Sequence, residues 1–297
     1  MTHVLNVTDL EKSYRFVKAL KGVSLSVPEG AVFGVLGPNG SGKTTMLGIL
    51  LNILSADKGS FEWFGNREGV GYRKKIGSLL ETPNFYHYLS AQNNLRITQS
   101  VSGRGSKEEI DIVLKKVDLL SWKHKKFKSF SLGMKQRLAI ASALLGSPKV
   151  LVLDEPTNGL DPVGIAEIRE LILELSKKGH TIIMASHLLD EVEKVCTHVA
   201  ILKKGELIVS GSVQDVLAQE DLVELSSSDL FRLKEIALNM PGHRDVTIAE
   251  QFVQISFEKG EANLEQINRH CFEKGVILTH LTMKRKRLEE KFFELTN

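Results

Sequence analysis

Residues 34–45 read GVLGPNGSGKTT and place a glycine-rich loop between an apolar run and the start of a predicted helix. The spacing Gly37-x-x-x-x-Gly42-Lys43-Thr44 fits the P-loop pattern. Glycines let such a loop curl until its backbone N–H groups point inward, and the helix that follows adds the partial positive charge of its N-terminus. The stretch therefore predicts a strand, a phosphate-binding loop and a helix, in that order.

Each position of this loop is a candidate nucleotide contact. Lys43 is expected to neutralise the β- and γ-phosphates, Thr44 to offer its hydroxyl to Mg²⁺, and Thr45 to bond a more distal oxygen. The candidate nucleotide-binding residues are Gly37, Pro38, Asn39, Gly40, Ser41, Gly42, Lys43, Thr44 and Thr45. The alternative is a glycine-rich turn that binds nothing. It fits poorly, because the pattern follows a buried strand and opens a helix, as the motif requires.

Two acids follow a second apolar run. The segment VLVLDEP runs four apolar residues into Asp154 and Glu155. A buried strand delivers both acids to the carboxyl edge of a sheet, where open α/β folds bind ligands. Asp154 then suits a Mg²⁺ shell, and Glu155 is placed to orient and deprotonate an attacking water. The alternative is an acidic strand end that faces solvent, and the P-loop upstream argues against it.

The order of apolar segments predicts an α/β fold. Residues 149–156 and 180–186 are short buried strands, and residues 161–179 between them have helical spacing, which together indicate a parallel sheet. The helix after the P-loop is expected over 42–54, and alternating apolar residues near the N-terminus predict half-buried strands. Residues 90–146 read as helices, inserted between two strands of the sheet.

Two domains are expected from this organisation. The first is a nucleotide-binding domain at 1–218, whose helical subdomain spans about 82–146. The second, at 219–297, is a small α+β accessory domain with the β-α-β-β-α-β order of the ferredoxin-like pattern. Its last strand is expected at 276–281, followed by a closing helix at 285–297.

Composition bounds the setting of the protein. The chain has 297 residues, 42% of them hydrophobic and 25% charged, and its net charge of +3 gives no reason to expect a nucleic-acid partner. The two cysteines show neither a disulfide framework nor a metal-binding spacing, which favours a reducing cytoplasm. No signal peptide and no run near the ~18 apolar residues of a membrane helix is found. If the protein works at a membrane, another chain must span it.

The sequence FSLGMKQRLAIASALLGSPKVLVLDEPTNGLDP, residues 130–162, resembles the ATP-binding cassette (ABC) family of P-loop NTPases. The family's signature loop reads leucine-serine-glycine-glycine-glutamine, and here residues 130–134 read FSLGM. The resemblance implies that Ser131 and Gly133 contact the γ-phosphate held by a partner subunit, so that a head-to-tail dimer with two ATP molecules completes the site. Ser131 also suits a helix N-cap, and we expect both roles. Leu132 and Met134 depart from the pattern, which leaves open slower hydrolysis or a non-identical partner.

Three further positions match the family, and two of them, His187 and Tyr14, also have a structural alternative. Asp161 closes the sequence NGLD, which the family places at the dimer interface. His187 follows a buried strand, where the family's histidine bonds the γ-phosphate and helps to hold the water and Glu155. Tyr14 stands where the family has an aromatic residue that stacks on adenine, and core packing is its alternative. The resemblance thus implies Glu155 and His187 as catalytic residues, with ATP and Mg²⁺ as cofactors.

Glu81 stands where most of the family has a glutamine that reaches Mg²⁺. Because its carboxylate offers a hard oxygen ligand, the expected metal ligands are Thr44, Glu81 and Asp154. A glutamate followed by P-x-F-Y resembles the ATPases of bacitracin-resistance and lantibiotic-immunity exporters, with neutral drift from glutamine as the alternative.

Two weaker surface signals stay open. Phe85, Tyr86 and Tyr88 either form a docking patch for a membrane partner or pack locally. The basic segments at 123–128 and 284–287 either touch anionic lipid headgroups or form a solvated surface.

These features predict the ATP-hydrolysing subunit of an ABC exporter for peptide antibiotics, drugs or lipid-like substrates. A separate multi-span permease would hold it on the cytoplasmic face of the membrane, and its dimer partner would be a second copy or a sister chain. The alternatives are a non-transport ABC ATPase and an ATP-gated regulatory module. Translation factors of the first kind carry two cassettes and repair proteins a long coiled coil, whereas this chain has one cassette and a short insert.

Overall fold

The computed structural model describes residues 2–65, 70–80, 83–217, 220–284, 288–289 and 292. The chain divides into two compact units, Met1–Gly211 and Ser212–Asn297. The boundary lies before residue 218, where the sequence placed it, because the short helix α7 (Val213–Leu217) groups with the second unit. Each unit has a hydrophobic core of its own.

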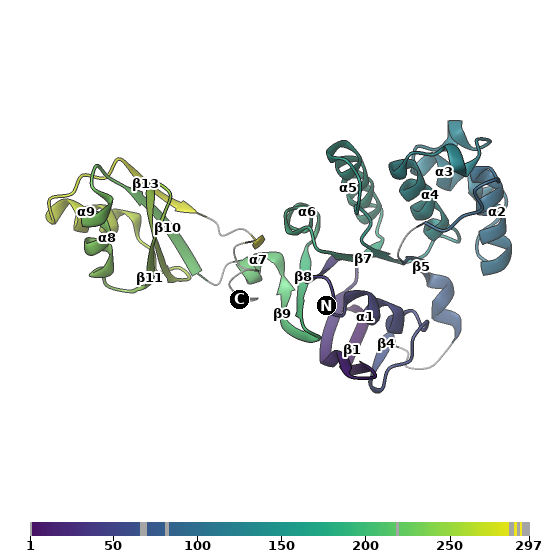
Figure 1. Cartoon of the computed structure of the whole chain (residues 1–297), viewed down its shortest axis with the longest axis horizontal. Coiled ribbons are helices and arrows are strands. Elements are labelled where there is room, and N and C mark those ends of the chain that lie inside the picture. The colour runs from purple at the N-terminus through teal and green to yellow at the C-terminus, as the bar shows by residue number, and fades with distance from the viewer. Residues whose placement is uncertain are drawn as a thin grey trace. The chain divides into compact units, whose positions relative to one another are not determined.

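A six-stranded sheet in the order β5-β6-β7-β3-β8-β9 forms the centre of the first unit (Figure 1). The strands are β3 (Val32–Leu36), β5 (Ile76–Leu79), β6 (Val150–Asp154), β7 (Thr181–Ser186), β8 (His198–Lys203) and β9 (Glu206–Ser212). The first five strands of that order pair in parallel. Since β3, β6 and β7 are buried along their whole length, both faces of the sheet are covered. The predicted parallel core is thereby confirmed.

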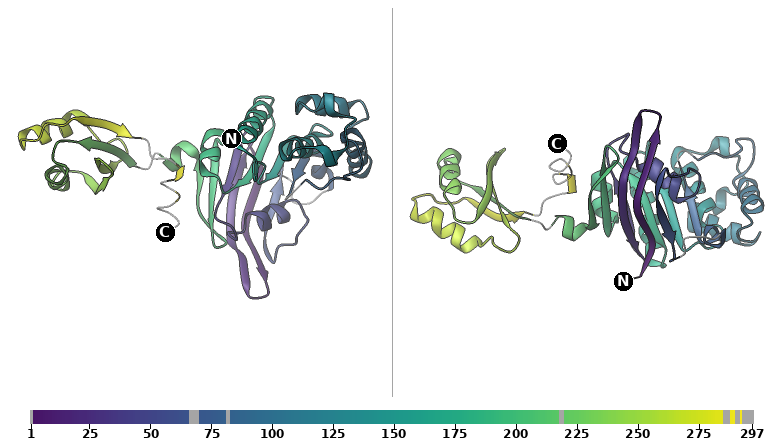
Figure 2. Two further views of the ribbon diagram at one scale, coloured as in Figure 1. Left: turned by 45° about the horizontal axis from the view of Figure 1, so that its top comes forward. Right: turned by 90° about the horizontal axis from the view of Figure 1, so that it is seen from below.

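An antiparallel sheet covers part of this unit (Figure 2). It consists of β1 (His3–Tyr14), β2 (Val17–Pro28) and β4 (Lys58–Trp63), and it shares one core with helix α1 (Lys43–Leu50). The helix ends earlier than the expected residue 54. Asn52 takes a left-handed backbone with φ of 59°, and the buried Trp63 donates its Nε1–H to the Leu50 carbonyl oxygen at 2.9 Å, which satisfies one of the last helix carbonyls.

The helical insertion is confirmed as a group of helices beside the sheet (Figure 1). It contains α2 (Ala91–Ser102), α3 (Glu109–Lys116) and α4 (Leu132–Leu144), and α4 packs against β5. Two more helices belong to the core, α5 (Pro162–Lys177) and α6 (Leu189–Val195), and three short 3₁₀ turns span Val70–Lys75, Leu120–Trp122 and Phe127–Ser129. Helix α6 lies so close to β3 that a Cβ on Gly34 would stand 2.7 Å from Val192 Cγ1.

The second unit has the predicted ferredoxin-like arrangement. Strands β10 (Glu220–Ser226), β11 (His243–Ala249), β12 (Phe252–Glu258) and β13 (His280–Lys284) pair antiparallel in the order β11-β12-β10-β13, with α8 (Leu230–Leu238) and α9 (Leu264–Glu273) packed on one face. The last strand is present but starts at His280 and not at residue 276, because Val276 enters the core as the chain leaves α9. The expected closing helix lies outside the described residues except for Leu288, Glu289 and Phe292.

Candidate active site

The P-loop joins β3 to α1, as its pattern predicts. Gly42 has a φ of 106°, and a Cβ on it would lie 2.5 Å from the Ala19 carbonyl oxygen, so this position requires glycine. Helix α1 begins at Lys43 without a side-chain cap, which leaves its first N–H groups open to an anion. Ser41 is only 2% exposed, and its hydroxyl has no hydrogen-bond partner among the described residues.

Three parallel strands bring the P-loop and the acids to one edge of the sheet. β3 ends at the P-loop, β6 ends at Asp154, and β7, which lies between them, ends one residue before His187. Lys43 is buried, and its Nζ donates to the Gly37 carbonyl oxygen at 2.7 Å and lies 3.7 Å from Glu155 Oε1. The edge therefore carries an ammonium group and two carboxylates within one small volume.

Glu155 and His187 form the centre of the candidate site. His187 Nδ1 and Glu155 Oε2 are 2.8 Å apart. Glu155 has a φ of 48°, a backbone conformation that costs of order 1–3 kcal/mol in a non-glycine residue. Its N–H donates to the Ala185 carbonyl oxygen of β7 at 3.0 Å, which fixes the turn. A carboxylate held in this way between an imidazole and an ammonium group can orient a water and accept its proton.

The signature loop and the NGLD loop meet at a different groove. Ser131 caps α4, where its Oγ accepts from Met134 N at 3.3 Å, and Asp161 caps α5, where its Oδ1 accepts from Gly164 N at 2.9 Å. Ser131, Gly133 and Asp161 line a groove of about 500 Å³. None of the described residues of the P-loop, nor Glu155 or His187, lines it. The predicted cap at Ser131 is confirmed, and its phosphate contact stays a prediction.

Leu132 connects the two loops of this groove. Its Cδ2 lies 3.2 Å from where a Cβ on Gly159 would stand, and a Cβ on Gly133 would lie 4.0 Å from Leu160 Cδ2. Leu132 is 45% exposed, so its side chain spans the loops at the surface and is not part of the core. The leucine that departs from the family's pattern thus makes a contact that a glycine lacks.

Sequence reasoning did not single out Arg137, which also connects this region. Its Nη1 donates to the Val117 carbonyl oxygen at 3.1 Å, and its Nη2 lies 2.8 Å from Glu167 Oε2. The guanidinium group therefore ties the helical insertion to α5. No sequence signal could have identified this role, because Arg137 and Glu167 become neighbours only when α4 and α5 pack.

The structure decides some of the other predicted positions. Tyr14 is 44% exposed and Lys12 Nζ lies 5.6 Å from the centre of its ring, so core packing is the wrong alternative, while adenine stacking stays a prediction. Glu81 lies outside the described residues. Phe85 packs locally, with its ring 5.2 Å from that of Phe127, whereas Tyr86 and Tyr88 are exposed.

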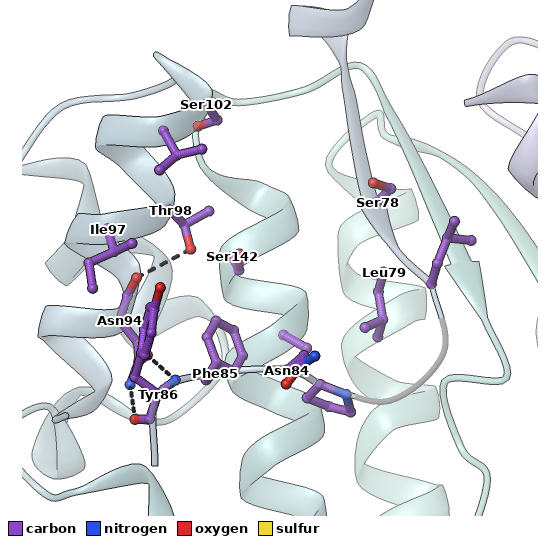
Figure 3. Close-up of a pocket in the computed structure, with 14 residues that line it drawn as sticks. Ser78, Leu79, Asn84, Phe85, Tyr86, Asn94, Ile97, Thr98, Ser102 and Ser142 are labelled. Atoms are coloured by element: carbon purple, nitrogen blue, oxygen red, sulfur yellow. Dashed lines mark hydrogen bonds between the residues drawn. The ribbon is translucent and has the colours of Figure 1, made fainter. Parts of the chain in front are cut away.

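A second groove, of about 380 Å³, runs between β5 and the helical insertion (Figure 3). Asn94 of α2 fixes the backbone of Tyr86 at the edge of this groove. Its Oδ1 accepts from Tyr86 N at 2.8 Å, and its Nδ2 donates to Tyr86 O at 3.2 Å. Leu79, Phe85 and Val101 give the groove an apolar lining. An apolar groove with a fixed rim suits an inserted helix or loop of another protein.

The residues of the first site fit Mg²⁺ as a cofactor. Among the described residues no three of His, Cys, Asp and Glu cluster as a metal cage. Mg²⁺ does not need one, because in nucleotide sites it takes one or two protein oxygens and completes its shell with phosphates and water. The Thr44 hydroxyl and the buried Asp154 carboxylate are oxygen donors of this type.

The P-loop on a parallel sheet, with an acid pair and a histidine at the same edge, defines a P-loop ATPase. A family model described as ABC transporter matches residues 20–158, and one described as AAA domain, putative AbiEii toxin, Type IV TA system, matches residues 125–192. The chain belongs to the ABC transporter family as an ATP-binding subunit, and it is an ATPase. Subunits of this family dimerise and work with a separate membrane permease.

Two relatives and one solved structure illustrate the relationship. The chain is 36% identical to the bacitracin transport ATP-binding protein BcrA of Bacillus licheniformis, over 99% of this chain and 98% of BcrA. It is 39% identical to the lantibiotic transport ATP-binding protein SrtF of Streptococcus pyogenes, over 77% of this chain and 98% of SrtF. The structure of cbiO1 from Clostridium perfringens, part of the ABC transporter complex cbiONQ, has a TM-score of 0.67 at 30% identity and covers 81% of this chain and 97% of its own. The non-transport alternative is not favoured.

Proposed function

We propose that the chain is the ATPase subunit of an exporter for peptide antibiotics and that it works at the cytoplasmic face of a membrane. The observation that carries the ATPase part is the contact between Glu155 and His187 beside the buried Lys43. The export part is supported by the match to BcrA, which extends over nearly the whole of both chains. In the part of the chain that the structure describes, none of the helices has the length and apolar character of a membrane span.

ATP binding is assigned to residues 37–45, with the exposed ring of Tyr14 stacking on adenine. Lys43 would leave the Gly37 carbonyl oxygen and turn toward the β- and γ-phosphates. Thr44 and Asp154 would hold Mg²⁺, which neutralises phosphate charge when it is bound. Glu81 is proposed as a further oxygen ligand.

Hydrolysis is assigned to the pair at the centre of the site. Glu155 would orient the attacking water and accept its proton, while His187 fixes the Glu155 carboxylate through its Nδ1 and turns its other ring nitrogen to the γ-phosphate. Ser131, Gly133 and Asp161 of a second subunit would complete the site. Their placement in a separate groove of the same chain supports this head-to-tail arrangement.

The groove beside β5 is proposed to receive a cytoplasmic segment of a multi-span permease (Figure 3). One wall comes from the strand that leads to residue 81 and the other from α2, so an inserted segment would contact both the catalytic core and the helical insertion. Such a contact would link the permease to both parts of the subunit.

The test is to trap the ATP-bound dimer with Glu155→Gln and to identify what it binds. A tagged variant is expressed in its native cell, membranes are solubilised gently with MgATP, and co-purifying proteins are identified by mass spectrometry. We expect a multi-span permease. Recovery with ribosomes, nucleic acid or assembly factors would overturn the exporter and leave the ATPase assignment intact.

A further inference from the structure

The helical insertion carries more positive charge than the chain as a whole. Residues 83–146 contain eleven Lys and Arg and four Asp and Glu, a net charge of +7, whereas the whole chain has +3. The four acids all lie within 108–118, so neither 83–107 nor 119–146 contains any. Charge of one sign that is segregated in this way raises the local concentration of anions.

Two acid-free segments run side by side at the surface of this insertion. Phe127 N donates to the Leu89 carbonyl oxygen at 2.9 Å, and Lys128 N donates to the His87 carbonyl oxygen at 3.0 Å. The pairing brings the loop after β5, which is rich in aromatic residues, next to the lysine-rich segment 123–128.

Phe127 orients the lysines around it. Its side chain is 1% exposed, and its ring lies 5.2 Å from that of Phe85 and 5.5 Å from that of His87. Because Phe127 is anchored inward, the lysines on either side, Lys126 and Lys128, stand out into solvent. The buried Phe127 therefore anchors segment 123–128, and the ammonium groups of Lys126 and Lys128 face the solvent.

The resulting basic–aromatic surface consists of Tyr86, His87, Tyr88, Lys125, Lys126 and Lys128, all of them exposed. Tyr86 and Tyr88 are 51% and 67% exposed, and their rings meet edge to face at 6.0 Å. Lys123 is not part of this surface, because its Nζ is paired with Asp111 at 2.8 Å.

We propose that the basic–aromatic surface binds the headgroups of an anionic phospholipid bilayer directly. Lysines near such a surface are attracted by its negative potential, and tyrosines favour the boundary between headgroups and acyl chains. The surface adjoins the groove proposed for the permease, since Tyr86 lines that groove as well (Figure 3). A bilayer contact there is additional to any permease contact and does not depend on the transported substrate.

The test is sedimentation of the purified full chain with vesicles, without any permease. Vesicles of phosphatidylcholine alone are compared with vesicles in which part of the lipid is phosphatidylglycerol. The chain should bind only the anionic vesicles and should dissociate as salt is added. The variant Lys125→Gln/Lys126→Gln/Lys128→Gln should bind about a hundredfold more weakly, since each lysine near the surface contributes roughly a fivefold factor.

The matched control is Lys177→Gln/Lys259→Gln/Lys274→Gln, which changes the net charge equally at exposed lysines elsewhere and should bind like the parent chain. Thermal unfolding of both triple variants establishes that they are folded. Equal weakening by the control would show non-specific attraction and would overturn the proposal. Tighter binding to a short RNA than to anionic vesicles would also overturn it, because the surface would then serve a nucleic acid.

Discussion

The two polar centres of the first unit differ in how complete they are. At the P-loop edge, Glu155 contacts both Lys43 and His187; Lys43 is buried, Glu155 is partly buried and His187 is exposed. In the signature groove, Ser131 and Asp161 are already engaged as helix caps and face open space. The first centre combines an ammonium group, two carboxylates and an imidazole, whereas the second offers backbone N–H groups, the Ser131 hydroxyl and the Asp161 carboxylate. This difference is what we expect if the chain carries two halves of an active site, each completed by the other half from a second subunit.

The largest effect is expected at the P-loop edge from Glu155→Gln. An amide keeps the shape of the side chain but cannot accept a proton, so ATP turnover should fall by about 100-fold or more while ATP binding stays. Phosphate release and equilibrium ATP binding measure the two quantities. Glu170→Gln, on the exposed face of α5, is the control and should turn over normally. Unchanged turnover in Glu155→Gln would remove Glu155 from its catalytic role.

The next effect distinguishes two glycines of the same loop. Gly42→Ala places a Cβ 2.5 Å from the Ala19 carbonyl oxygen, whereas a Cβ on Gly40 meets nothing within 4 Å. Both glycines have positive φ, so both substitutions carry backbone strain of about 1–2 kcal/mol, and only Gly42→Ala adds a collision. Gly42→Ala should therefore weaken ATP binding far more than Gly40→Ala, as measured by calorimetry. Equal losses would mean that the collision is relieved elsewhere.

A smaller effect is expected in the signature groove from Leu132→Ala. The variant loses the contact across Gly159, so the NGLD loop loosens and kcat should fall a few-fold, roughly 1 kcal/mol, while the ATP affinity of the isolated subunit stays. Val163→Ala is the control, because Val163 lines the same groove and is 66% exposed. A change in ATP affinity would show that the two halves are not separate within one chain.

The smallest effect lies outside both halves, at Glu224 of the second unit. Burial raises the pKa of this carboxyl, but the hydrogen bonds from Lys284 and Gln254, together with the positive charge of Lys284, outweigh it and leave the pKa below its ordinary value of 4.5. The ionised group therefore stabilises the unit above pH ~4.5, and this contribution is lost as the pH falls through the folded-state pKa. Amide exchange of β10 and β12 should rise in that range, and less so in Glu224→Gln.

Sequence predicted the elements of the fold and the residues of the first centre because their patterns are local. A P-loop, an acid pair after a buried strand and the cap Ser131 each occupy a few consecutive residues. The contact of Leu132 with Gly159 and the ion pair of Arg137 with Glu167 could not be predicted, since they depend on how α4 and α5 pack. The start of the last strand, β13, was misplaced for a related reason. An apolar run has the same sequence pattern whether its backbone pairs in a sheet or its side chains only fill the core.

The central claim is that the P-loop edge of one subunit and the signature groove of a second subunit form one active site. Its most direct test is the ATP-dependent association of Glu155→Gln, measured by sedimentation with and without Ser131→Glu. The account predicts that Glu155→Gln dimerises with two ATP molecules, and that the double variant binds ATP with unchanged affinity and stays monomeric, because a carboxylate in the signature groove repels the γ-phosphate of the second subunit. Dimerisation of the double variant as tight as that of Glu155→Gln, or loss of ATP binding by its monomer, would contradict the account.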